Sequence, residues 1–310
     1  MHTRLESQLR MMGFELQSTD LPMLLVVLIW GANFSIVKLA LAEFSPLVFT
    51  ALRFVVAALI LLVFLWIREG SIAPAAGSWW PLIGAGIVGN TLYQVLFTLG
   101  LSMTTAANSA LLVSITPALV AFLGAMIGIE RLTRIVGLGI ALALLGVIFV
   151  LATRGVALSF ETLGGDLLVL GSACCWTLYT LSVQSIGAKM SPLRITTLTM
   201  VTGVPGLLLV GGPGLLQMNW ATISLGAWGG LAYATLLALV ACYVIWNSSV
   251  QVAGSNRTAV YGCLIPIVAT LVAWPLLDEQ PTLWQALGAA LVIAGVLLTR
   301  KTSRQARSQE

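Results

Sequence analysis

Long apolar stretches separated by short polar or charged segments make up most of this chain. A helix that crosses a lipid bilayer needs about 20 predominantly apolar residues. Breaking the sequence at charges and at Gly/Pro clusters leaves ten segments of spanning or near-spanning length: 21–42, 45–67, 79–102, 104–128, 134–152, 166–187, 191–211, 225–248, 254–277 and 283–299. Their unbroken Leu/Val/Ala/Gly runs lack the alternation of a membrane barrel. We therefore predict an all-α integral membrane protein with ten transmembrane helices.

The composition excludes the soluble classes. The 310 residues are 59% hydrophobic and 8% charged, with a mean hydropathy of +1.01, whereas soluble domains are roughly 25% charged. The tails and loops are too short for a soluble catalytic or nucleic-acid-binding domain. The net charge of +4 therefore reflects membrane topology, and we expect the lipid bilayer, not a nucleic acid, as the partner.

The two halves of the chain carry matching landmarks in the same order. Trp30 matches Trp176, and Ser45-Pro46-Leu47 matches Ser191-Pro192-Leu193, both at an offset of 146 residues. Four later residues recur at an offset of 149: Pro117, Glu130, Gly139 and Gly146 match Pro266, Glu279, Gly288 and Gly295. Five helices per copy is an odd number, so the second copy must enter the membrane from the opposite side. This predicts two inverted five-helix repeats.

The loop charges predict the orientation. Lys and Arg accumulate on the cytoplasmic side of short loops. With both tails inside, twelve of these residues fall on the cytoplasmic side and only Arg154 falls in an outer loop. We expect a cytoplasmic tail at 1–20, the first repeat at 21–152, an outer linker at 153–165, the second repeat at 166–299 and a basic cytoplasmic tail at 300–310.

Several motifs resemble a known family. The first helix contains Trp30-Gly31-x-Asn33-Phe34, and helices 4 and 9 are centred on prolines and followed by Glu130 and Glu279. The second half closes with Trp274-Pro275-Leu276-Leu277-Asp278-Glu279 and then Gly288 and Gly295. From Leu21 to Thr299 the chain resembles the EamA-type branch of the drug/metabolite transporter superfamily. Gln280-Pro281 departs from the family pattern in an outer loop.

The resemblance implies a function class. Members of this branch are mainly bacterial inner-membrane carriers of amino acids and other metabolites, often exporters, and aromatic amino-acid exporters are one known type. Inverted repeats serve alternating access around a site at the membrane midplane. We therefore expect a secondary carrier for a small-molecule substrate, with amino acids, including aromatic ones, as the leading cargo. An exporter of another amphipathic, drug-like compound is the alternative, followed by a membrane-embedded enzyme or a channel.

Large polar and aromatic side chains inside lipid should face the bundle interior, and they mark a candidate pathway. Packing between helices is the competing interpretation. In helices 1 and 6 one face repeats at matched spacing: Trp30, Asn33, Phe34 and Lys38, then Trp176, Tyr179, Thr180 and Gln184. Helices 3, 8 and 9 add Asn90, Tyr93, Gln94, Tyr243, Trp246, Asn247 and Tyr261. These fifteen residues form the predicted substrate site.

Few charges lie inside the predicted helices. No Asp or Glu falls within the central two turns of any of them, which disfavours the proton/cation exchange that a buried acid supports. A facilitative carrier or an exchanger fits better, and a proton route through water or Glu43 is the alternative. Lys38 is close enough to its helix end to snorkel, and Arg53 either anchors to Glu43 or backbone carbonyls, or attracts a substrate carboxylate.

Pro117 and Pro266 occupy matched mid-helix positions, where proline removes one backbone hydrogen bond. We expect matched bends that shape the cavity or act as gating hinges, with static kinks as the alternative. The single histidine, His2, lies in a tail, and the four cysteines show no CxxC spacing. No Walker or hydrolase motif appears, so we expect no cofactor, no metal and no enzymatic activity. Monomer and dimer are both compatible with the sequence.

Overall fold

The structure is a computed structural model that describes residues 19–128, 134–151 and 160–307. Within these ranges the chain forms helices joined by turns, without strands. The helices are α2 (Asp20–Ala40), α3 (Pro46–Glu69), α4 (Trp79–Gly86), η1 (Ile87–Leu92), α5 (Tyr93–Met103), α6 (Ala106–Val113), α7 (Thr116–Met126), α8 (Arg134–Leu151), α9 (Phe160–Ile186), η3 (Gly187–Lys189), α10 (Pro192–Gln217), η4 (Trp220–Thr222), α11 (Leu225–Tyr233), η5 (Ala234–Ala241), α12 (Cys242–Ala253), α13 (Ser255–Val260), η6 (Tyr261–Leu264), α14 (Ile265–Leu277) and α15 (Leu283–Arg307).

These pieces combine into ten membrane-length units. Eight are long and apolar enough to cross a bilayer, and the remaining two, α8 and α15, contain the shorter apolar stretches Gly137–Gly146 and Leu283–Gly295. The predicted ten-helix, all-α membrane fold is confirmed. Helix 6 starts earlier than expected, at Phe160, and α10 continues past the expected residue 211 to Gln217.

The repeated Ser-Pro-Leu motif starts a helix in each half. Ser45 and Ser191 have extended backbone conformations, and the proline that follows each of them occupies the first turn of α3 or α10. Proline is favoured there because its missing N–H has no partner inside the helix anyway. The Ser191 hydroxyl also accepts a 3.1 Å hydrogen bond from the backbone N–H of Arg194. The motif is therefore a helix-start signal that was retained in both copies.

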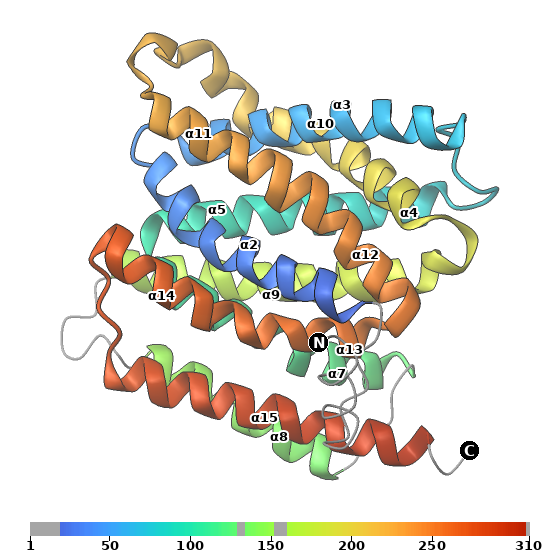
Figure 1. Cartoon of the computed structure of the whole chain (residues 1–310), viewed down its shortest axis with the longest axis vertical. Helices are drawn as coiled ribbons and strands as arrows, with labels where there is room; N and C mark the ends of the chain where they lie inside the picture. Colours follow the sequence, from blue (N-terminus) through green and yellow to red (C-terminus); the bar gives the residue numbers. More distant parts are fainter. Residues whose placement is uncertain (1–18, 129–133, 152–159, 308–310) are drawn as a thin grey trace, which may run out of the picture.

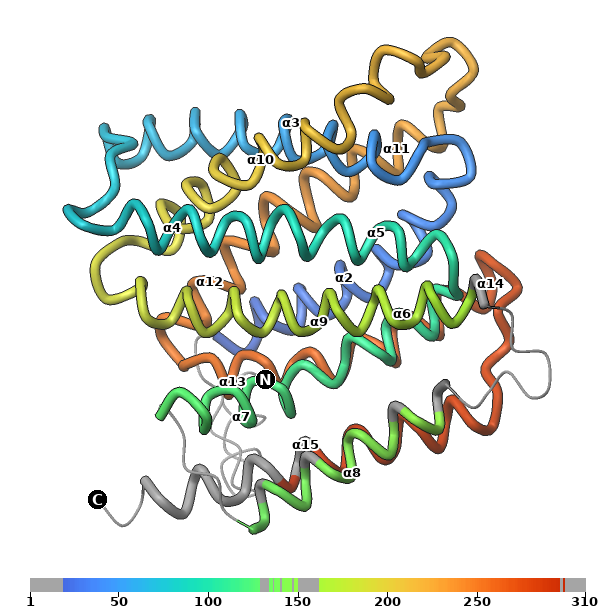
Figure 2. The backbone as a smooth tube through the Cα atoms, turned by 180° about the vertical axis from the view of Figure 1, so that it is seen from behind, coloured from blue at the N-terminus to red at the C-terminus, as the bar shows by residue number. Residues whose placement is uncertain are grey.

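Equivalent helices of the two repeats meet each other. α3 packs against α10 at one end of the molecule, and α8 lies antiparallel to α15 at the other end (Figures 1 and 2). Between them, α5 packs against α9 and α2 packs against α14 (Figure 1). This arrangement places α2, α5, α9 and α12 at the centre, where the conserved spacing of the two repeats brings their aromatic residues together.

Reciprocal glycine contacts reveal the two-fold relationship between the halves. A Cβ atom added at Gly146 would lie 2.7 Å from the carbonyl oxygen of Gly288, and one added at Gly295 would meet the carbonyl oxygen of Gly139. Gly146 and Gly295 are equivalent in the repeat, as are Gly139 and Gly288. Such i-to-j and j-to-i pairing is the mark of a two-fold interface. It also lets the backbones of α8 and α15 touch.

Candidate functional site

A cavity of ≈ 50 Å³ lies between the two repeats. Eight of the fifteen predicted site residues line it: Trp30, Asn33, Phe34, Tyr93, Gln94, Trp176, Tyr243 and Trp246. Sites for small molecules usually enclose roughly 300–1,000 Å³. This conformation is therefore too closed for a solute of amino-acid size, and binding one requires the lining side chains to separate.

Three tryptophans and a tyrosine fill the centre. The ring of Trp30 lies 5.5 Å from that of Trp176, 6.1 Å from Tyr243 and 5.2 Å from Trp246, measured between centroids. The indole N–H of Trp30 donates a 2.9 Å hydrogen bond to the carbonyl oxygen of Ala238. Trp30 and Trp176 are equivalent in the two repeats, so the pair lies on the pseudo-two-fold axis. Both proposed roles of these rings, packing and lining, are compatible with this geometry.

A polar chain crosses the cavity wall from one repeat to the other. The guanidinium of Arg53 in α3 donates to the side-chain oxygen of Gln94 in α5. The amide nitrogen of Gln94 in turn donates a 2.9 Å hydrogen bond to the hydroxyl of Tyr243 in α12. Arg53 is 1% exposed, and its guanidinium also lies over the rings of Phe49 and Phe54. This places a buried cation beside the cavity.

Of the alternatives for Arg53, the anchor to Glu43 is not formed in this structure. Glu43 lies in the loop after α2, where its carboxylate accepts hydrogen bonds of 2.6 Å from both the hydroxyl and the backbone N–H of Ser224, the residue that caps α11. These hydrogen bonds lower the pKa of Glu43 below its ordinary value, the hydroxyl contributing most. Glu43 therefore ties the α2–α3 loop to the start of α11 and has no contact with the cavity.

Lys38 and Gln184, predicted to line the pathway, bind helix ends instead. The Lys38 ammonium donates to the carbonyl oxygens of Leu101 and Thr104 at the end of α5. The Gln184 side-chain oxygen accepts a 3.2 Å hydrogen bond from the backbone N–H of Ser255 at the start of α13. The two side chains are equivalent in the repeat, and each holds the equivalent interhelical turn. The ammonium of Lys38 thus finds its acceptors at the end of α5, and snorkelling to the membrane surface stays a prediction.

Three further predicted residues form a layer behind Trp176. The Asn247 amide donates to the Tyr179 hydroxyl at 2.8 Å and to the Thr196 hydroxyl at 2.8 Å, which joins α12, α9 and α10. The Thr180 hydroxyl donates to the carbonyl oxygen of Trp176 in its own helix. Tyr179, Thr180 and Asn247 are buried and lie outside the cavity lining.

Asn90 and Tyr261 also lie away from the lining. Asn90 is fully buried against α10, where its Cβ occupies the space beside Gly203. The Tyr261 hydroxyl donates to the carboxylate of Asp20, which lies 3.4 Å from the Arg257 guanidinium. Tyr261 therefore links η6 to the first turn of α2. Neither residue reaches the cavity in this conformation.

Both proline-containing helices break at the matched position. α6 ends at Val113 and α7 begins at Thr116, with Pro117 in its first turn. In the second repeat η6 separates α13 from α14, and Pro266 lies in the first turn of α14. Residues at both breaks, among them Val113, Thr116, Gly262 and Ile265, line the cavity. That these two breaks act as gating hinges stays a prediction.

The sequence does not predict two π-helical segments of the structure. η1 lies between α4 and α5, and η5 lies between α11 and α12, at positions that overlap when the repeat offset is applied. A π-helical turn widens the helix locally and is frequent at functional sites. Ala238 and Leu239 of η5 line the cavity. Their small and aliphatic side chains gave no signal, because a wider turn has no characteristic residue pattern.

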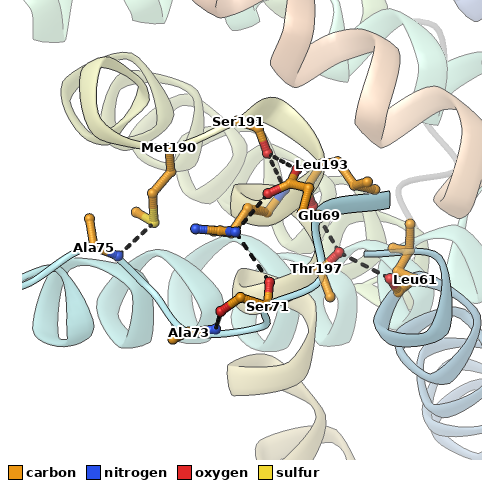
Figure 3. A network of polar contacts seen from close by, with 10 residues as sticks. Leu61, Glu69, Ser71, Ala73, Ala75, Met190, Ser191, Leu193 and Thr197 are labelled. Atoms are coloured by element: carbon orange, nitrogen blue, oxygen red, sulfur yellow. Dashed lines mark hydrogen bonds and ion pairs between the residues drawn. The ribbon is translucent and has the colours of Figure 1, made fainter. Parts of the chain in front are cut away.

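Carboxylate side chains join neighbouring helices on two opposite sides of the bundle. Among the residues seen in Figure 3, Ser191 donates to the Glu69 carboxylate, which also forms a 2.8 Å ion pair with Arg194 and so joins the end of α3 to the start of α10. On the opposite side of the bundle, where α14 ends, the two oxygens of Glu279 accept hydrogen bonds of 3.0 Å from the backbone N–H groups of Ala106 and Ala107. Its repeat counterpart, Glu130, lies outside the described residues.

Metal chemistry has no visible site in the part of the chain that the structure describes. The described residues contain no group of three His, Cys, Asp or Glu side chains able to hold an ion. No disulfide joins the four cysteines of the described residues, and Cys242 and Cys263 are buried in helices. The donors and acceptors that this molecule offers to a solute are therefore the guanidinium, amide, indole and hydroxyl groups around the cavity.

The fold and the cavity define a class: a membrane transporter built from two inverted five-helix repeats around a central site. The model of the EamA-like transporter family matches residues 17–152 and again 163–301. The chain belongs to this family, part of the drug/metabolite transporter superfamily.

Relatives of known name agree with this class. An uncharacterized transporter of Bacillus subtilis is 32% identical over 274 residues, covering 86% of this chain and 88% of that protein. A protein of Salmonella typhimurium named a probable amino-acid metabolite efflux pump is 26% identical over 295 residues, covering 91% and 96%. One crystal structure shares the fold with a TM-score of 0.66 and 18% identity, covering 93% of this chain and 98% of that one.

Proposed function

We propose that this protein is an alternating-access carrier of the bacterial cytoplasmic membrane that exports small amphipathic metabolites, with amino acids, including aromatic ones, as the leading cargo. The observation that carries the proposal is the cavity on the pseudo-two-fold axis, where Trp30, Trp176 and Trp246 meet the polar groups of Arg53 and Gln94. Aromatic walls stack on a flat apolar body, and a few polar groups orient its polar end.

Export and carriage of amino acids draw support from the Salmonella relative's name. A carrier for cationic drug-like compounds is less compatible with the site. Among the described residues of the lining, the charged side chain is Arg53, whose positive charge opposes a cation. The same lining offers no carboxylate that a proton-coupled antiporter would use. Exchange or facilitated diffusion therefore fits this cavity better.

The test is counterflow in proteoliposomes that contain the purified protein. Vesicles loaded with unlabelled phenylalanine, tryptophan or threonine should accelerate the entry of the same labelled amino acid, and the rate should saturate. A pore gives flux without this trans-stimulation. If none of the three amino acids crosses, the amino-acid assignment fails, and other metabolites must be screened.

Two tryptophan variants form a matched pair for this assay. Trp176→Ala removes an aromatic wall of the cavity and should reduce counterflow at least about tenfold, since aromatic contacts and burial are lost together. Trp66→Ala changes an indole that is 65% exposed on the outside of α3 and should leave counterflow near the wild-type rate. Equal effects of the two changes would argue against the cavity as the site.

A further inference from the structure

Three polar atoms at the cavity are buried and have no hydrogen-bond partner among the described residues. They are the Nε of Arg53, the indole nitrogen of Trp246 and the side-chain oxygen of Asn33. Leaving a buried polar group unpaired costs free energy, and a charged group costs more. Two donors, one of them on a cation, and one acceptor therefore border a single small cavity that lies between the two repeats.

The charge of Arg53 is only partly compensated. Its guanidinium contacts the neutral oxygen of Gln94 and the faces of Phe49 and Phe54, and none of its contacts among the described residues is a carboxylate. A cation buried in a membrane protein is costly and is usually paired or functional. The guanidinium fork also matches the geometry of a carboxylate, which accepts two parallel hydrogen bonds.

We propose that Arg53 is the anion-recognition residue of this carrier, and that the anionic group of the cargo exchanges for the Gln94 oxygen at the guanidinium. The inference rests on the proposed function and narrows it: the cargo carries a carboxylate next to an aromatic or aliphatic body. Trp246 supplies the second donor, and Asn33 accepts from an N–H of the cargo.

Replacing Gln94 at the guanidinium affects the contact between the two repeats, because Gln94 binds both Arg53 and Tyr243. Its oxygen accepts from Arg53 in the first repeat, and its nitrogen donates to Tyr243 in the second. A carboxylate forms a stronger hydrogen bond with the guanidinium than a neutral amide does. When it takes that place, Gln94 loses one of its two anchors, and the hydrogen bond that ties the repeats at the axis is weakened. Cargo binding thereby favours the movement of one repeat against the other.

The test compares probes that differ only in the charged groups. Binding to the purified full chain is measured by quenching of tryptophan fluorescence and by thermal shift. Phenylalanine and 3-phenylpropionate carry a carboxylate, whereas phenylalaninamide and phenethylamine lack it. We expect the two carboxylates to bind at least about tenfold more tightly than the other two, the effect of a charge-assisted hydrogen bond. Equal binding of the amines, or binding of no carboxylate, would overturn the proposal.

Four variants locate the effect. Arg53→Gln should abolish the preference for carboxylates, while Arg68→Gln, an exposed arginine of the same helix that lies over Phe64, should keep it. Gln94→Glu provides a built-in carboxylate for Arg53, so the folded variant should lose carboxylate binding at least about tenfold. Gln94→Met removes the competitor and should tighten it. Wild-type affinity in Gln94→Glu would refute anion recognition at Arg53, and unchanged or weaker binding in Gln94→Met would refute the exchange.

These binding measurements are independent of transport. A chain that binds carboxylates through Arg53 but shows no counterflow would contradict the proposed carrier function and leave the recognition intact. Counterflow of a solute that has no carboxylate, unaffected by Arg53→Gln, would support the carrier and overturn the recognition.

Discussion

Gln94 and Tyr243 form a 2.9 Å hydrogen bond with each other, and they are 149 residues apart, the same offset that relates Pro117 to Pro266. A residue that contacts its own repeat counterpart must lie on the symmetry axis. Trp30 and Trp176 do the same at their own offset of 146. The axis of the inverted repeat therefore passes through the cavity, and the substrate site proposed here is shared equally by the two halves.

Tyr243→Phe should destabilise the protein by about 1–3 kcal/mol, because the Gln94 amide is left buried without its acceptor. Thermal unfolding in detergent measures this. Tyr93→Phe is the matched control, since the Tyr93 hydroxyl makes no hydrogen bond with the described residues and its ring lines the same cavity. A loss of stability in Tyr93→Phe as large as that in Tyr243→Phe would contradict the importance of the axial hydrogen bond.

Gly146→Ala should also destabilise the fold by about 1–3 kcal/mol through overpacking. The new methyl group would meet the carbonyl oxygen of Gly288 at 2.7 Å, and backbone cannot move away as a flexible side chain can. In Gly137→Ala, in the same helix, the new methyl group meets no atom of the described residues within 4 Å, so the change should be neutral or stabilising by up to about 1 kcal/mol. The melting temperature should therefore fall in Gly146→Ala and stay unchanged or rise in Gly137→Ala.

Glu279→Gln should weaken the start of α6 by about 0.5–2 kcal/mol, the usual effect of losing a helix cap. The two oxygens of the Glu279 carboxylate accept hydrogen bonds from two backbone N–H groups. The glutamine side chain has only one oxygen, so it can replace only one of these two acceptors. Asp278→Asn serves as the control, because this exposed neighbour has a left-handed backbone (φ 54°) that asparagine tolerates. Hydrogen exchange at Ala106 and Ala107 reports the change locally.

The contact between Glu43 and Ser224 should depend on pH. Hydrogen bonding lowers the pKa of Glu43 in the folded state, so its stabilising effect is complete above the ordinary carboxyl pKa and is lost as the pH falls through the lowered value. Glu43→Gln should remove this component of the acid dependence, and Ser224→Ala should reduce it. Melting curves between pH 7 and acidic pH, compared with wild type, measure the difference. A slope unchanged in Glu43→Gln would exclude the contact as a contributor.

Both termini should be cytoplasmic. Reporter fusions at residue 1 and at residue 310 should give the same intracellular signal, while a cysteine placed at Thr222 should react with an impermeant reagent from outside. Lys189, at the opposite end of the molecule, is the matched position, and Lys189→Cys should react only after permeabilisation. Termini on opposite sides would contradict the inverted repeat and the carrier proposal that depends on it.

The sequence predicts the fold well because lipid imposes one simple constraint on it. Each spanning segment must satisfy its own backbone hydrogen bonds, so apolar length alone locates helices. The matching residues of the two halves then identify the repeat, because each has the same structural role in both copies. Ser45-Pro46 and Ser191-Pro192 start helices, and Gly146 and Gly295 permit close packing.

The site is predicted less completely. Of the helical stripe from Trp30 to Lys38, the side chains of Trp30, Asn33 and Phe34 line the cavity, whereas Lys38 reaches the end of α5. Helical spacing shows which face of the helix a side chain occupies, but it does not show how deep in the membrane the side chain lies or which group it contacts. Arg53 was recognisable as a lone cation in an apolar segment, yet its partner, Gln94, comes from another helix. The π-helical turns have no sequence signal.

The touching backbones of α8 and α15 suggest how such a chain originated. A self-complementary face is what two identical five-helix polypeptides would use to assemble as an antiparallel homodimer in the membrane. Gene duplication and fusion of such a polypeptide would make the same face internal. If so, the halves should still recognise each other when they are synthesised as separate fragments, and coexpression of the two should restore a complete carrier.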